Sequence, residues 1–201
     1  MATDMNPVEK KEKTDGRKQR SARSRDKIKT SIITLIRSGS YLPRALDISE
    51  HSGLSMRTVF RHIDDMESLL REIAADCQKE ILAQFLKPYA STEWRTQLGE
   101  RIARRAEIWD FMMPVRISVA LRRFDSDFLM EMYQRTIDLE RASLQSNLPE
   151  KTVADAALFA ALNQAMGISC WISLRLEQGL SRDEAEAVVR RTVDALISNV
   201  E

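Results

Sequence analysis

The sequence predicts an all-α protein of 201 residues. Only 6 glycines and 5 prolines interrupt it, too few for the many turns of a fold built from short strands. Apolar residues recur with the period of about 3.6 residues that is typical of helices, and no stretch alternates apolar and polar residues for long enough to indicate a strand. This length suits one domain, or one small domain packed on a larger one.

Charge is distributed unevenly along the chain. Residues 1–64 carry a net charge of +6 and residues 65–201 a net charge of −5, which indicates that the N-terminal third meets a polyanion. Within it, residues 1–23 are rich in Lys and Arg and lack apolar periodicity. We expect a basic, flexible tail there, either a disordered leader or an arm that contacts the phosphates or the minor groove of DNA.

Three helices are expected between residues 24 and 65. The first spans residues 24–39 and has a single apolar face. That face consists of Ile28, Ile32, Leu35 and Ile36. The second follows Pro43 and ends at Gly53, which can adopt the left-handed conformation of a helix end. The third begins at Ser55, a good N-cap residue, and ends near Ile63.

The helix that begins at Ser55 is expected to have two different faces. Its inner contact with the preceding helix would consist of Ile48, Leu54, Val59 and Ile63. Its other residues would lie outside: Met56, Arg57, Thr58, Phe60, Arg61 and His62. Such side chains form either a solvated charged face or a surface that another molecule reads. Two helices joined by a tight glycine turn are typical of a helix-turn-helix unit, whose second helix enters the major groove of DNA.

Residues 25–73 resemble the TetR family of transcriptional regulators. The first helix carries this resemblance together with the stretches ALDISEHSGLSMRTVFRHI and DDMESLLREI. It implies a homodimeric repressor that leaves a palindromic DNA operator when it binds a small-molecule effector. The residues expected to contact DNA are Arg44, Ser55, Met56, Arg57, Thr58, Phe60, Arg61 and His62. The family often has a tyrosine at the position of Phe60 and a lysine at that of Met66, so two phosphate contacts are absent here.

Residues 66–201 are expected to form a helical regulatory and dimerisation domain, which resembles the family in architecture only. Asp64 or Asp65 would cap its first helix, residues 66–86. Further helices are predicted at 92–110, 114–124, 126–147, 150–178 and 181–197. Ser181 and Glu184 have the spacing of a capping box at the start of the last one.

The last two predicted helices carry small and β-branched residues on one side. These would let a second subunit approach closely and form a four-helix bundle with it; the alternative is a packing face within one chain. The residues expected at this dimer interface are Ala157, Ala161, Ala165, Ile168, Ile172, Val189, Val193 and Leu196.

The other side of the helix at 150–178 would face the middle of its own domain. With large groups from residues 109–133 it could line an effector cavity, although Met and aromatic residues of this kind more often form ordinary core. The residues assigned to this cavity are Trp109, Met113, Arg116, Tyr133, Phe159, Asn163, Met166 and Cys170. Arg116 would either meet an anionic effector or lie exposed.

Other classes of function have weaker support in the sequence. The two cysteines lack a CxxC spacing and both histidines lie in the helix-turn-helix stretch, so no metal site, cofactor or catalytic histidine is expected. The alternatives are a DNA-binding adaptor without a small-molecule ligand, and a helical small-molecule-binding protein or enzyme. Residues 156–174 are uncharged, but polar residues interrupt them, which favours a buried helix over a membrane span. No apolar signal segment opens the chain, so we expect a cytoplasmic protein.

Overall fold

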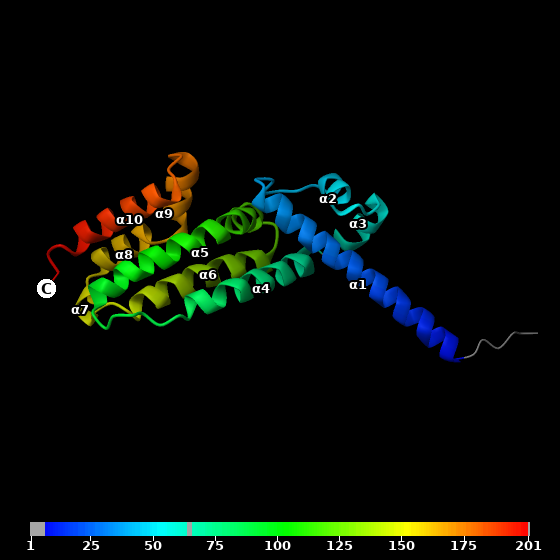
Figure 1. The fold of residues 1–201 in the computed structure, drawn as a ribbon, viewed down its shortest axis with the longest axis horizontal. Coiled ribbons are helices and arrows are strands. Elements are labelled where there is room, and N and C mark those ends of the chain that lie inside the picture. The colour runs from blue at the N-terminus through cyan, green and yellow to red at the C-terminus, as the bar shows by residue number, and fades with distance from the viewer. Residues whose placement is uncertain (1–6, 64–65, 201) are drawn as a thin grey trace, which may run out of the picture. The chain divides into compact units, whose positions relative to one another are not determined.

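A computed structural model describes residues 7–63 and 66–200 of the chain (Figure 1). Within these ranges every regular element is a helix, which confirms the predicted all-α class. The chain divides into two compact units, residues 1–75 and 76–201, and each has its own buried core.

The first unit is a small helical cluster. It contains α1 (Pro7–Arg37), α2 (Ala45–Ser52), α3 (Met56–Ile63) and the start of α4 (Met66–Phe85). α2 and α3 pack against each other and against α1 (Figure 1). Its buried core includes Ile28, Ile32, Ile36, Ile48, Val59, Leu69 and Ile73. Glu72 of α4 also binds two cations of α1, Arg25 at 2.8 Å and Lys29 at 3.1 Å, so ion pairs join α1 and α4.

Helix α1 begins earlier than the sequence pattern indicated. The predicted flexible tail, residues 1–23, is helical from Pro7 onward, and residues 1–6 lie outside the described ranges. Proline is favoured at the first position of a helix, and Lys, Arg, Glu and Gln are all good helix formers. A solvated helix needs no apolar stripe, so apolar periodicity could not reveal this extension.

The second unit is a bundle around one long helix. Its helices are the rest of α4, α5 (Trp94–Arg122), α6 (Asp127–Gln145), α7 (Glu150–Ala154), α8 (Ala156–Ala165), α9 (Ile168–Ile172), the π-helical turn η1 (Ser173–Glu177) and α10 (Arg182–Ile197). α5 packs against α6, α9 and α10 (Figure 1). The core is contributed mainly by Leu98, Ile102, Trp109, Leu162, Trp171, Val189, Val193 and Ile197.

Two of the predicted helices prove to be one. The helices expected at 92–110 and 114–124 are joined in α5, which contains Pro114 in its interior. Proline removes one backbone hydrogen bond from a helix. Buried residues lie on both sides of it, Trp109 before and Val119 after, and their packing offsets that loss.

Conversely, the single helix expected at 150–178 is broken into several segments. Asp155 ends α7 and caps α8, accepting hydrogen bonds from the backbone N–H of Ala157 at 3.1 Å and of Leu158 at 3.0 Å. Gly167 then precedes α9, and the axis bends by 42° between α8 and the segment 168–177. The uncharged stretch 156–174 favoured one continuous helix in the sequence.

The expected starts and stops of other helices agree with the structure. Ser181 and Glu184 form the predicted capping box of α10, with donor–acceptor distances of 2.8 and 3.3 Å. Gly179, just before it, has a φ of +69°. The predicted caps of α4, Asp64 and Asp65, lie outside the described residues.

Candidate nucleic-acid interface

Helix α3 has one buried and one exposed face. Val59 is completely buried, whereas Arg57 and Arg61 are exposed and Phe60 exposes 51% of its surface. Met56 and Thr58 are half-buried. The exposed arginines are four residues apart and therefore project from the same side of the helix, one turn apart.

The turn between α2 and α3 is fixed by backbone conformation and by serine hydroxyls. Gly53 has a φ of +66° and ends α2 in the left-handed conformation, as predicted. Ser49 donates a hydrogen bond to the carbonyl of Leu54 at 2.6 Å. Ser55 accepts one from the N–H of Thr58 at 3.3 Å, which confirms its role as the N-cap of α3. The hydroxyls of Ser55 and Thr58 lie 3.0 Å apart, so both belong to the cap itself.

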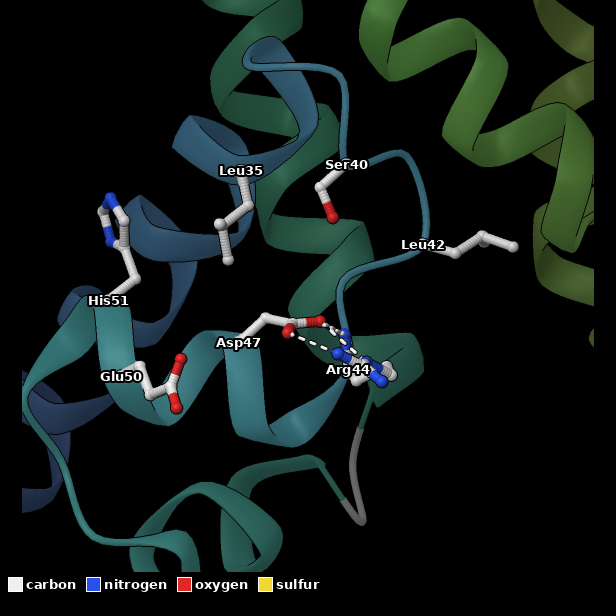
Figure 2. Close-up of a pocket in the computed structure, with 7 residues that line it drawn as sticks. All are labelled: Leu35, Ser40, Leu42, Arg44, Asp47, Glu50 and His51. Carbon is white, nitrogen blue, oxygen red and sulfur yellow. Dashed lines mark hydrogen bonds and ion pairs between the residues drawn. The ribbon is translucent and has the colours of Figure 1, made fainter.

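The cations of this surface differ in their partners. Neither Arg57 nor Arg61 has a carboxylate partner within 4.0 Å in the part of the chain that the structure describes. Arg44 is exposed but binds Asp47, with a 2.8 Å bond from its backbone N–H and a 3.1 Å ion pair from its guanidinium (Figure 2). This pairing lowers the pKa of the Asp47 carboxyl. The uncompensated positive charge of the motif therefore lies on α3.

His62 does not belong to the exposed face to which it was assigned. It is buried, and its Nε2 atom has no hydrogen-bond partner. His62 follows Val59 by three residues and so shares its inward side of α3. Burial lowers the pKa of His62 below its ordinary value, and the positive charges of Arg61 and Arg25 lower it further.

This environment predicts that the protein loses stability in mild acid. The folded state keeps His62 neutral, whereas the unfolded chain binds a proton near the ordinary pKa of 6.5. Above pH 6.5, His62 should therefore make no pH-dependent contribution to the free energy of unfolding. As the pH decreases through 6.5 toward the lower pKa of the folded state, the free energy of unfolding should fall. Urea unfolding at a series of pH values measures it.

Two glutamine variants separate this effect from general acid denaturation. His62→Gln should flatten the decrease, because glutamine does not titrate. His51→Gln, the same substitution at the exposed second histidine, is the matched control. Identical pH profiles for wild type and His62→Gln would contradict the assignment.

The N-terminal part of α1 adds further positive charge to the first unit. Lys18, Arg20, Arg23 and Lys27 are exposed, and this part of α1 extends beyond α2 and α3 (Figure 1). A helix with its side chains is about 10–12 Å wide, whereas the minor groove of DNA is about 6 Å wide. The contact of this segment with the phosphates or the minor groove of DNA stays a prediction.

No protein-family model, curated protein or solved structure matches this chain.

A hollow of about 640 Å³ lies beside the motif, also within the first unit. It is lined by Leu35, Ser40, Leu42, Arg44, Asp47, Glu50 and His51 (Figure 2). It is wide open, and the ion pair between Arg44 and Asp47 occupies one of its walls (Figure 2). Sequence reasoning did not anticipate it, because its residues come from α1, α2 and the connection between them.

The residues assigned to a dimer interface separate into two groups. Ala165, Ile168, Val189 and Val193 are buried in the core of their own chain, which corrects their assignment. The other four lie nearer the surface: Ala157 is exposed, and Ala161, Ile172 and Leu196 are half-buried. An apolar stripe shows that one face of a helix is buried, but it does not tell which chain covers it.

The residues assigned to an effector cavity are largely packed together. Trp109, Arg116, Phe159 and Met166 are buried, and Met113, Tyr133, Asn163 and Cys170 are half-buried. Trp109 and Met166 border a small, partly open space of about 10 Å³, room for about one water molecule. Arg116 is buried, with its guanidinium 3.7 Å from the centre of the Tyr133 ring.

The described residues offer little support for a metal site or for a membrane-spanning helix. No group of three or more His, Cys, Asp or Glu side chains among them is placed to hold a metal ion. None of the described helices alone is long and apolar enough to cross a membrane; α8 and the segment 168–177 pass that test only as a bent pair.

Proposed function

We propose that this chain is a sequence-specific DNA-binding transcriptional regulator that acts as a homodimer. The observation that carries the proposal is the exposed face of α3. It presents Arg57 and Arg61 one turn apart without carboxylate partners among the described residues, on a helix that Val59 anchors in the core. Arginine pairs well with guanine edges and with phosphates.

In the proposed complex α3 lies in the major groove. Arg57 is near the N-terminus of α3, the end that contacts base edges in helix-turn-helix proteins, and it reads the sequence there. Arg61 contacts phosphate, since it lies one turn later. Phe60 and Met66 cannot supply charge, so Arg61 and the exposed cations of α1 neutralise the backbone in their place.

The proposed dimer sets the spacing of the two half-sites. A two-fold pair presents its recognition helices about 34 Å apart, one turn of DNA, and binds a palindrome. The surface for this pairing includes Ala157, Ala161, Ile172 and Leu196, the residues of the predicted interface that remain outside the core. As a repressor, the dimer would leave its operator when an effector favours a different arrangement of its helices.

Selection of DNA from a random pool by the purified full-length protein tests this proposal. A palindrome with half-sites one helical turn apart is the expected product. Enrichment of no sequence, with binding that disappears equally for all DNA as salt increases, would overturn sequence-specific recognition.

Removal of residues 1–23 is predicted to weaken binding to all DNA about equally. In the proposed complex the exposed cations Lys18, Arg20 and Arg23 bind phosphates, and the salt slope decreases by about 0.9 for each phosphate that is no longer neutralised. Gel-shift titration at several salt concentrations, with the selected palindrome and with a scrambled duplex, measures both quantities.

A charge-only variant provides the control for this truncation. Lys18, Arg20 and Arg23 are exposed, and their replacement by glutamine keeps a good helix former at each position. It should reproduce part of the decrease in salt slope. A truncated protein with an unchanged salt slope would contradict a role for the extension in binding.

A second candidate is a DNA-binding adaptor that has no small-molecule effector. The observation that favours it is the small volume of the space beside Trp109 and Met166, about 10 Å³. Thermal unfolding with small molecules separates the two candidates, because a sensor gains stability from its ligand and an adaptor does not.

A further inference from the structure

Phe60 is the largest apolar side chain that the described residues of the first unit expose. It shows 51% of its surface, whereas Leu42 and Leu46 show 48% each. At about 100° per residue, Phe60 lies about 60° around the axis of α3 from Arg57 and about 100° from Arg61. The outer face of α3 therefore combines two arginines with one exposed aromatic ring.

The charges beside this ring favour a polyanion as the molecule that covers it. Arg57 and Arg61 have no carboxylate partner among the described residues. An apolar protein surface on this face would bury both cations unpaired, which is unfavourable. DNA instead offers phosphates to the arginines and both polar and apolar groups on the edges of its bases, so it suits the whole face.

The phenyl ring must contact DNA in a different way from the arginines around it. It has no polar atom with which to bind a phosphate or to form a hydrogen bond to a base edge. The apolar group that base edges present in the major groove is the methyl group at C5 of thymine, and phenylalanine is one of the side chains that contact it. Thymine is thus the base that suits Phe60.

The rest of α3 narrows the bases that this helix can read. Adenine is bound best by Asn or Gln and cytosine by Asp or Glu, and none of these four residue types occurs in Met56–Ile63. The hydroxyls of Ser55 and Thr58 lie 3.0 Å apart within the N-terminal cap, and His62 is buried. The contacts that remain are those of arginine with guanine and of an apolar side chain with thymine.

We propose that Phe60 determines specificity for thymine by contacting its methyl group, close to the guanine that Arg57 reads. This inference rests on the proposed DNA-binding function and adds the base that a further side chain selects. Three residues of a helix rise about 4.5 Å, and successive base pairs of DNA rise about 3.4 Å. Each half-site should therefore contain a guanine and a thymine within two base pairs of each other.

Deoxyuridine substitution tests the contact directly, because deoxyuridine keeps the hydrogen-bonding groups of thymine and lacks only its methyl group. Each thymine of the selected palindrome, with its symmetry mate, is replaced in turn, and gel-shift titration with the full-length protein measures the affinity. One pair of positions should be sensitive, within two base pairs of the guanine for which Arg57→Ala loses preference. The loss there should be about fourfold for each methyl group and about fifteenfold for both half-sites. Sensitivity at no position overturns the proposal.

Substitutions assign the methyl contact to Phe60. Phe60→Ala should lower the affinity for the thymine palindrome and abolish the difference between thymine and deoxyuridine, while Phe60→Leu should retain part of it. Phe124→Ala, the same change at an exposed phenylalanine of the second unit, is the matched control and should retain all of it. Since Phe60 is exposed, the variants should unfold at nearly the wild-type temperature. A full difference in Phe60→Ala overturns the assignment.

Methylated cytosine tests the same contact by restoring it. Exchange of the sensitive thymine–adenine pairs for cytosine–guanine pairs removes the methyl groups and should weaken binding. 5-Methylcytosine carries a methyl group at the same ring position as thymine, so its use in place of cytosine should strengthen binding by about fourfold for each half-site. Phe60→Ala should bind both duplexes equally. Equal binding of both duplexes by the wild-type protein overturns the proposal.

The failure of this inference differs from the failure of the proposed function. Enrichment of no sequence from the random pool overturns the proposed function and this inference with it. A selected palindrome that lacks a thymine within two base pairs of the guanine read by Arg57, or that tolerates deoxyuridine at every position, overturns the inference alone.

Discussion

Replacing Arg57 with alanine is expected to lower the affinity for the selected palindrome by about a hundredfold. A bidentate pair between arginine and guanine contributes about 1–3 kcal/mol of discrimination, and a dimer makes this contact twice, once in each half-site. Preference between the palindrome and variants altered at the contacted base should decrease as well. Gel-shift titrations at one fixed salt concentration measure both effects.

Arg61→Ala should behave differently from Arg57→Ala. A phosphate contact carries no sequence information, so its removal should weaken binding to all duplexes and reduce the salt slope by about 2 for the dimer. Arg191→Ala, at an exposed arginine of α10, is the matched control and should bind as wild type does. Since Arg57 and Arg61 are exposed, the thermal stability of each variant should change little. Unchanged affinity and salt slope in both variants would show that α3 is not the DNA-contacting helix.

Leu162→Ala is expected to have the largest effect on stability. Leu162 of α8 is completely buried in the core of the second unit. Truncation removes its burial and leaves a cavity, which together cost about 2–5 kcal/mol, a large part of a typical folding free energy of about 5–15 kcal/mol. Urea unfolding followed by circular dichroism should show a markedly lower midpoint with an unchanged slope.

The matched control for this substitution lies in the same region of the chain. Leu176 of η1 exposes 48% of its surface, and Leu176→Ala should change the free energy of unfolding much less. If both alanine variants had the same effect, the packing assigned to α8 would be contradicted.

Local chemistry made part of the fold predictable. Gly53 and Ser55 are residue types whose conformations and hydrogen bonds mark the end of one helix and the start of the next, and the structure has both where the sequence indicated them. The capping box of Ser181 and Glu184 is a further case. These features depend on a few neighbouring residues, so the sequence contains the information that specifies them.

Features that depend on distant contacts could not be predicted in the same way. His62 is basic and lies beside Arg61, yet its position three residues after Val59 turns it inward. Val189 and Val193 form an apolar stripe, but only the packing of α10 against α5 and α8 shows that their own chain covers them. The burial of Arg101, Arg105 and Arg116 in α5 was not predicted either, because arginine is usually exposed.

The helical extension of α1 has a kinetic consequence under the proposed function. Its exposed cations, Lys18, Arg20 and Arg23, attract any stretch of DNA regardless of its base order, because phosphates are the same everywhere. Such attraction holds a protein near the duplex between encounters and lets it slide and hop along the strand. The extension would therefore shorten the search for an operator, while the choice of the operator would depend on α3.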